Sequence, residues 1–169
     1  GCCLPGRKYL SCDALYPGGA YTETPAYQHD RERMRASELA SAPYSGFDFT
    51  NYVRLENGAA ALRISAPLMD AAQDCASQCF TSHNNQYEGE AAINYGYEHG
   101  FGSNLTWFTA RGNTDIAQTA VSNWVNSSGH FQTMVSTKYD CVGVGVCIRN
   151  NIAYCYMFAG NPNSVNAYG

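Results

Sequence analysis

The sequence predicts an α+β protein in which helices come first and an antiparallel hairpin comes last. Apolar residues recur at helical spacing in residues 68–79, and the period changes to alternation with glycine in residues 142–146. The chain has 169 residues, of which 45% are hydrophobic, so it is long enough for one packed domain. Helices followed by antiparallel strands are typical of a layered α+β domain.

The first 46 residues are expected to form an irregular N-terminal extension. Glycine and proline interrupt this stretch repeatedly, and it contains three of the eight cysteines. Only residues 30–40 have the composition of a short helix. The domain itself is expected to cover residues 47–169.

Two helices are predicted at the start of this domain. The first covers residues 47–56 and ends at Asn57-Gly58, a pair that favours a helix C-terminus. The second begins at Ser65-Ala66-Pro67, where the serine caps the helix and the proline occupies its first turn. Its spacing is expected to place Cys75 and Cys79 on one inward face.

Residues 84–114 are polar and rich in glycine and tyrosine, so we expect a long loop there. Loops of this length inside a compact domain are usually functional. The loop contains many aromatic residues, which either form a partner surface or cover the core beneath it: Tyr87, Tyr95, Tyr97, Phe101, Trp107 and Phe108.

The last third of the chain predicts a helix and then a hairpin. The helix begins at Asp115 and ends near residues 127–129. Residues 142–146 and 152–158 are the two expected strands, and residues 149–151 are the turn between them.

Charge and composition exclude two classes of function. The 10 basic and 14 acidic residues give a net charge of −4, without the clustered Lys and Arg that phosphate binding needs, so nucleic acid is not an expected partner. No apolar run approaches the roughly 18 residues of a membrane-spanning helix.

The cysteines indicate an oxidising compartment. Eight dispersed cysteines without C-x-x-C spacing predict four disulfides and a secreted protein. Two sequons, at Asn104 and Asn126, are candidate glycosylation sites and agree with secretion.

Three segments, in order, resemble the CAP superfamily of cysteine-rich secretory proteins, insect venom antigens and class-one pathogenesis-related proteins. They are residues 71–83 with Cys79 and His83, residues 124–135 with the Gly129-His130-Phe131 motif, and the closing hairpin of residues 143–161. The resemblance covers roughly residues 47–163. It implies an α-β-α sandwich with a small antiparallel sheet between helices, held by disulfides.

The resemblance also implies a central cavity. Family members place two histidines and two glutamates around it, sometimes with zinc. The histidines map to His83 and His130, whereas the glutamates map to Ser103 and Ser127.

A serine hydroxyl is a poor ligand for a divalent metal, so the imidazole pair alone predicts weak zinc binding at most. Three glutamates of the expected loop could supply a missing carboxylate: Glu88, Glu90 and Glu98.

Two disulfides follow from the resemblance, namely Cys79–Cys147 and Cys141–Cys155. The remaining two bridges would then use Cys2, Cys3, Cys12 and Cys75, with Cys75 bonded to one of the three N-terminal cysteines.

The function that the resemblance implies is a secreted, non-enzymatic binding domain that carries a sterol or a fatty acid, or acts in defence or signalling. A second hypothesis is a structural component of an extracellular assembly, with the N-terminal extension and the tyrosine-rich loop as contacts. The third is a degenerate hydrolase, which the missing G-x-S-x-G motif and the missing family carboxylates disfavour.

Overall fold

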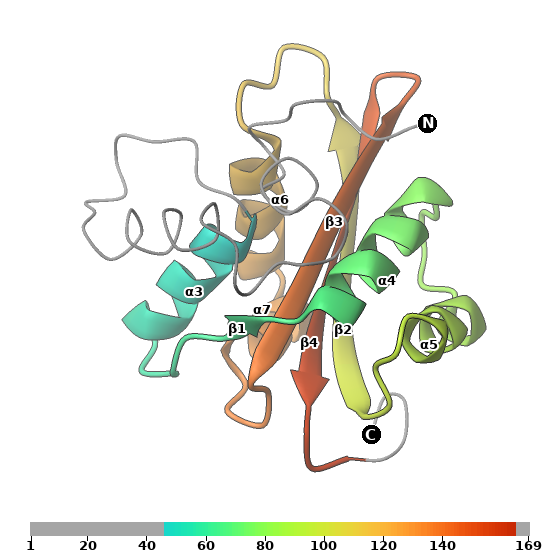
Figure 1. The fold of residues 1–169 in the computed structure, drawn as a ribbon. Helices are drawn as coiled ribbons and strands as arrows, with labels where there is room; N and C mark the ends of the chain where they lie inside the picture. Colours follow the sequence, from blue (N-terminus) through green and yellow to red (C-terminus); the bar gives the residue numbers. More distant parts are fainter. Residues whose placement is uncertain (1–45, 165–169) are drawn as a thin grey trace, which may run out of the picture.

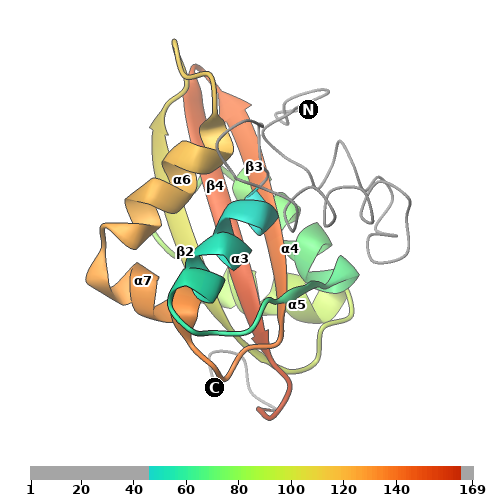
Figure 2. The ribbon, with the colours of Figure 1, turned by 90° about the vertical axis from the view of Figure 1, so that its left-hand side faces the viewer.

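A four-stranded sheet lies between two layers of helices in the computed structural model of the chain (Figure 1), which describes residues 46–164 and side chains from Phe49 onward. Helices α3, α6 and α7 cover one face of the sheet, and α4 and α5 cover the other (Figure 2). The elements in chain order are α3 Gly46–Glu56, β1 Arg63–Ile64, α4 Ala66–Ser77, α5 Asn85–Asn94, β2 Gly100–Thr109, α6 Ile116–Val125, α7 Ser128–Val135, β3 Cys141–Arg149 and β4 Ile152–Asn161.

The sheet is mixed, with the strand order β1-β3-β4-β2. The predicted hairpin is confirmed: β3 and β4 are antiparallel, and Asn150 and Asn151 of the turn both have positive φ, as a type I′ turn requires. The expected purely antiparallel sheet is corrected by β1, which pairs with β3 in parallel through two residues. Strand β2 pairs with β4 along its whole length and forms one edge of the sheet.

The helix boundaries follow local signals. The α3 helix ends at Glu56, and Gly58 adopts φ +78° just beyond it, as the Asn57-Gly58 pair predicts. The Ser65 hydroxyl accepts a hydrogen bond from Leu68 N–H at the start of α4, and Asp115 caps α6 through Gln118 N–H.

Helix α4 packs directly against β3 because two glycines leave room for its backbone. A Cβ on Gly143 would overlap backbone atoms of Leu68 and Met69, and one on Gly145 would lie 2.5 Å from the Gln73 nitrogen. Each of these glycines therefore lets the helix axis approach the sheet more closely than a side chain would permit.

The core consists of one apolar cluster on each face of the sheet. The cluster beneath α3, α6 and α7 contains Trp124, Met134 and Met157, and the cluster beneath α4 and α5 contains Leu68, Phe101 and Phe158. Alternate residues of β4 contribute to opposite clusters, as the two-residue period of a strand requires.

The long loop expected over residues 84–114 is wrong, because this stretch contains α5 and β2. The helix was not predicted because its buried residues are Glu88 and three small residues, Gly89, Ala91 and Ala92, so no large apolar stripe marks it. Tyr97 and Phe101 are buried, and Tyr87 and Phe108 are partly buried against the core, whereas Tyr95 and Trp107 are exposed.

The cysteines also differ from expectation. Helix α4 ends at Ser77, and Cys79 lies beyond the C-cap with φ +59°, so it does not continue the helical face of Cys75. Within residues 46–164, four thiols are free: Cys75, Cys79, Cys141 and Cys155. Cys147 is disulfide-bonded whereas Cys79 is a free thiol, so the predicted Cys79–Cys147 bridge is not formed.

The strand register explains why Cys141 and Cys155 do not pair. Cys141 lies opposite Gly160, whereas Cys155 lies opposite Val146, five residues further along β3. Two residues so displaced along a ladder exceed the reach of a disulfide. Cys75, expected to bond an N-terminal cysteine, is a fully buried free thiol, and Cys2, Cys3 and Cys12 lie outside the described residues.

Candidate functional site

Two histidines from opposite helical layers line one hollow at the edge of the sheet. The hollow has a volume of about 310 Å³ and lies beside β2; its walls are Thr81, Ser82, His83, Leu105, Thr106, Trp107 and His130. His83 comes from the segment between α4 and α5, and His130 comes from α7. The indole of Trp107 is 50% exposed and forms an apolar wall next to polar groups.

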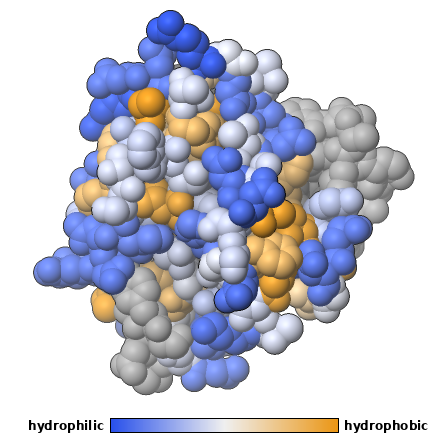
Figure 3. All heavy atoms as spheres, turned by 180° about the vertical axis from the view of Figure 1, so that it is seen from behind, coloured by the Kyte–Doolittle hydropathy of each residue, from blue (hydrophilic) through white to orange (hydrophobic). Residues whose placement is uncertain are grey.

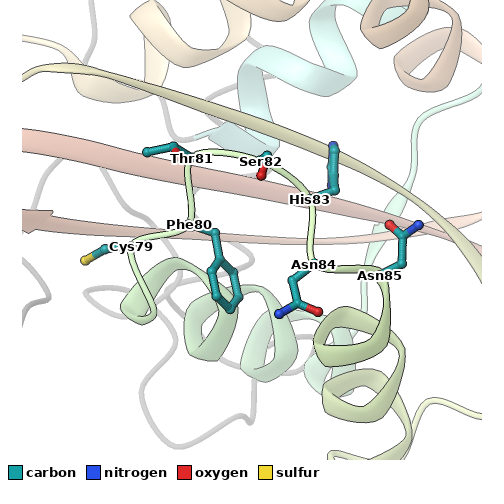
Figure 4. Close-up of a pocket in the computed structure, with 7 residues that line it drawn as sticks. All are labelled: Cys79, Phe80, Thr81, Ser82, His83, Asn84 and Asn85. Atoms are coloured by element: carbon teal, nitrogen blue, oxygen red, sulfur yellow. The ribbon is translucent and has the colours of Figure 1, made fainter.

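The segment that carries His83 borders a second, more open hollow of about 540 Å³, lined by residues 79–85. In Figure 4, His83 and Phe80 leave this segment in opposite directions, with the Phe80 ring pointing toward the helices and the His83 ring toward the strands. The Phe80 ring packs edge-on against Tyr87 of α5, with 5.4 Å between the ring centroids. This contact anchors the segment to α5.

A buried carboxylate orients His83. The Nδ1 atom of His83 lies 2.9 Å from Oε2 of Glu88, and the same oxygen accepts a hydrogen bond of 3.0 Å from the Tyr156 hydroxyl. Glu88 has no exposed surface, whereas the side chain of His83 is 35% exposed. Because Nδ1 is engaged by the carboxylate, Nε2 is the imidazole atom left to meet a ligand.

One aspartate of α4 adds polar contacts to the apolar packing between α4 and α5, the helix that carries Glu88. Asp74 accepts hydrogen bonds from Tyr87 (2.7 Å) and from Tyr95 (2.9 Å), one at each carboxylate oxygen. These interactions with Asp74, mainly the hydrogen bond, raise the pKa of Tyr87 to about 12. The aspartate is therefore part of the support of the site, although it lies outside the hollow.

A hydroxyl, not a carboxylate, orients His130. Its Nδ1 lies 2.8 Å from the Ser127 oxygen, and its backbone carbonyl accepts a hydrogen bond from the Asn104 amide of β2. Burial lowers the pKa of His130, and the positive charge of a protonated His83 lowers it further. The neutral imidazole is thus the favoured form of His130.

The two serines that replace family glutamates have different surroundings. Ser127 contacts His130 directly, whereas Ser103 is absent from the walls of the hollow, and its buried hydroxyl has no hydrogen-bond partner among the described residues.

The two sequons also differ. Asn104 has no exposed surface and its amide is bonded to His130, so its prediction as a glycosylation site is wrong for the folded chain. Asn126 is exposed at the C-terminus of α6.

The hollow has few side chains that are free to bind a metal ion, because its potential ligands already form hydrogen bonds. His83 and His130 are the two imidazoles available, and Glu88 is committed to His83 and to Tyr156. No group of three or more potential metal-binding side chains gathers in the described part of the chain. The other two candidate carboxylates, Glu90 and Glu98, lie on the exposed surface.

The parts of a hydrolytic triad are divided between two imidazoles. A serine nucleophile needs one imidazole that is bonded to the serine on one side and to a carboxylate on the other. Here the carboxylate Glu88 contacts His83, whereas the hydroxyl of Ser127 contacts His130 at Nδ1. This arrangement orients two imidazoles but does not bring a serine, an imidazole and a carboxylate together in one triad.

Sequence reasoning placed both histidines but gave Glu88 only as one of three candidates, and it did not find Tyr156. Asn84 supplies the signal for Glu88: as the N-cap of α5 it accepts a hydrogen bond from Tyr87 N–H, which puts Glu88 in the first turn. No comparable signal marks Tyr156, because its role depends on pairing across the sheet.

Comparison with known proteins supports the architecture. The model of the CAP family, described as the cysteine-rich secretory protein family, matches residues 47–161. No curated protein matches the chain. None of the described helices has the length and apolar character that crossing a membrane requires.

Solved structures with the same fold share little sequence with this chain. Venom allergen-like protein 4 of Schistosoma mansoni superposes with a TM-score of 0.58 at 14% identity, covering 72% of this chain and 89% of its own. NaASP2, in a crystal structure with Zn²⁺, gives a TM-score of 0.55 at 16% identity, covering 73% and 84%. An outer surface protein of Borrelia burgdorferi gives 0.54 at 15% identity, covering 68% and 88%.

Proposed function

The chain belongs to the cysteine-rich secretory protein (CAP) family, and we propose that its domain is an extracellular, non-enzymatic binding module whose ligand occupies the hollow between His83 and His130. Proteins of this family are generally non-enzymatic and mostly extracellular. The observation that carries the proposal is the convergence of two oriented imidazoles and a half-exposed indole on one hollow.

The side chains of the hollow suit recognition better than catalysis. Both imidazoles are fixed at Nδ1 by a neighbour, and each keeps one ring nitrogen for a ligand. Three hydroxyl side chains add polar contacts, and Leu105 and Trp107 add apolar surface. Binding sites commonly combine apolar walls with a few oriented polar groups in this way.

The size of the hollow bears on the ligand. About 310 Å³ is near the lower end of the roughly 300–1,000 Å³ found for small-molecule sites. A hollow of this size at a sheet edge favours one side chain or a short segment of a protein partner. Sterol or fatty-acid carriage, which the family resemblance implies, is the alternative that the test below separates.

We test the proposal by titrating the ¹⁵N-labelled full chain with four probes: a panel of uncharged capped heptapeptides, a set of monosaccharides, palmitate and cholesterol. The expected result is that peptides shift the resonances of Thr106, Trp107 and His130, that Trp107→Ala weakens this binding about tenfold, and that no probe is hydrolysed.

Matched controls are Tyr52→Ala, which removes an exposed aromatic side chain on α3 away from the hollow, and Trp107→Phe, which keeps an aromatic wall. If only palmitate or cholesterol shifts the resonances of the hollow, the ligand is a lipid and not a peptide. The absence of shifts at the hollow with every probe, or turnover of a peptide, would overturn the proposal.

A further inference from the structure

We propose that the open edge of β2 binds an extended, uncharged peptide segment as an added strand, with the hollow between His83 and His130 receiving one of its side chains. This inference rests on the proposed binding function and names the class of partner. It is carried by the unpaired backbone of β2, which the function proposed above does not use.

Strand β2 itself carries none of the sequence features that normally protect a sheet edge. It pairs with β4 over ten consecutive residues without a bulge, and its sequence, residues 100–109, contains no charged residue and no proline. Natural edge strands are usually shortened, bulged or marked by lysine or proline, because an unprotected edge pairs with other chains. The sequence and register of β2 therefore do not prevent the addition of a strand at this edge.

The register identifies which backbone groups face outward. Ala110 N–H donates to the Asn151 carbonyl at the end of the β2–β4 ladder, so residue 110 points toward β4. In an antiparallel pair the N–H and C=O of one residue point to the same side, and the side alternates along the strand. The backbone groups of Ser103, Leu105, Trp107 and Thr109 consequently point away from β4.

These outward groups have no partner in the part of the chain that the structure describes. Between residues 103 and 109, every backbone hydrogen bond of β2 belongs to its ladder with β4. Two of the four outward residues, Leu105 and Trp107, also line the hollow. Unpaired donors and acceptors alternate there at the spacing of a strand, and an extended peptide backbone complements that pattern.

The side chains around the edge indicate the character of the occupant. Residues 81–83 flank β2 on one side, and His130 flanks it on the other, so a single strand would lie between two walls. The carboxylate that contacts His83, Glu88, is buried and already bonded. A charged segment would find no counter-charge along β2, whereas an apolar side chain would pack against Trp107. Figure 3 views the molecule from the side of β2, where apolar patches lie between polar ones.

The experiment compares pairs of peptides, and the two members of each pair have the same side chains and differ in the backbone alone. Acetylated and amidated heptapeptides of alternating Thr and Val, with Val, Leu, Tyr or Trp at the centre, are titrated into the full chain by NMR and by calorimetry. Their partners carry N-methyl groups at the alternate residues whose N–H would face β2. We expect N-methylation to weaken binding at least tenfold, because two or more hydrogen bonds are lost.

A substitution tests the same hydrogen bonds from the protein. Thr109→Pro removes one outward N–H, and an edge strand tolerates proline at such a position. We expect this variant to bind the best peptide about three- to tenfold more weakly, and Thr109→Val, which keeps the N–H, to bind like the unchanged chain. Circular dichroism of both variants checks that the fold is retained.

Each other outcome overturns strand addition in a recognisable way. Equal binding of the normal and N-methylated peptides would leave the hollow as a side-chain pocket, so the proposed function would stand without an added strand. If other probes bind but no peptide does, the hollow is likewise a binding site without an added strand. A dimer of the free chain that Thr109→Pro dissociates in sedimentation would assign the edge to a second copy. If no probe shifts the resonances of residues that line the hollow, the proposed function itself is wrong.

Discussion

The two helical layers are attached to the sheet in different ways. Helix α4 lies backbone against backbone on β3, because Gly143 and Gly145 leave no side chain between them. On the opposite face, α6 and α7 contact the sheet through large side chains such as Trp124 and Met134. The first attachment tolerates almost no added volume, whereas the second can adjust through rotamers.

The layers also orient their imidazoles differently. On the α4 and α5 side, a buried carboxylate holds His83, and on the α7 side a hydroxyl holds His130. The hollow at the edge of β2 is where these two kinds of support meet. Its geometry therefore depends on both layers, and changes in the rigid layer should disturb it most.

The largest expected effect comes from filling the space between α4 and β3. Gly143→Ala places a Cβ against backbone atoms of Leu68 and Met69, which cannot rotate away. We expect a loss of about 3 kcal/mol or more in the free energy of unfolding, measured by urea titration.

Gly129→Ala in α7 is the matched control, because no atom of the described part of the chain lies within 4 Å of the added Cβ. Its unfolding free energy should remain unchanged or rise slightly. An equal loss in the two variants would contradict the distinction between the layers.

The next effect concerns the carboxylate support of His83. Glu88→Ala leaves the Tyr156 hydroxyl buried without its acceptor and removes the partner of His83, so we expect a loss of about 2–3 kcal/mol. Glu88→Gln keeps the shape and one acceptor oxygen, and it should cost about 1 kcal/mol.

The control for this series is Glu90→Gln. Glu90 is exposed, and within residues 46–164 its side chain bonds only to Gln86 on the same helix, so the unfolding midpoint of this variant should barely change. A small loss in Glu88→Ala would show that Glu88 does not support the layer.

The fold was predictable where local signals are strong. Ser65 and Asp115 mark helix starts, Gly58 marks a helix end, and Asn150-Asn151 marks the hairpin turn, each through the chemistry of a few adjacent residues. The same reasoning missed α5, whose buried face of one glutamate, one glycine and two alanines carries no apolar periodicity. It also missed β1, which spans two residues and forms only because β3 lies beside it.

The candidate site was predictable only in part. The motifs located His83 and His130, but which carboxylate reaches His83 depends on how α5 packs against the sheet. The cysteine pairs Cys79–Cys147 and Cys141–Cys155 were inferred from family resemblance. The register between β3 and β4 places Cys141 and Cys155 five residues apart along the ladder, and this register is not readable from the sequence. The burial of Asn104 likewise depends on tertiary contacts that no sequon reports.

The smallest effect is a change in the titration of His130. Burial and the charge of His83 lower the pKa of His130 below the value of about 6.5 for a free histidine. The folded state therefore resists protonation at His130. The stability that the neutral ring contributes is present above about pH 6.5 and is lost as the pH falls through the lowered pKa.

We expect two-dimensional ¹H–¹³C NMR of the histidine rings to show His130 titrating below pH 6.5. In His83→Ala the pKa of His130 should rise part of the way, because the charge of His83 is removed while burial remains the larger cause. His99→Ala is the control, since His99 is exposed and packs against Tyr97, not against the hollow. A pKa of His130 at or above 6.5 in the unchanged chain, or one that His83→Ala leaves unmoved, would show that the two imidazoles do not sense each other across the hollow. Each layer would then orient its own imidazole independently, and the hollow would not be one site shared by His83 and His130.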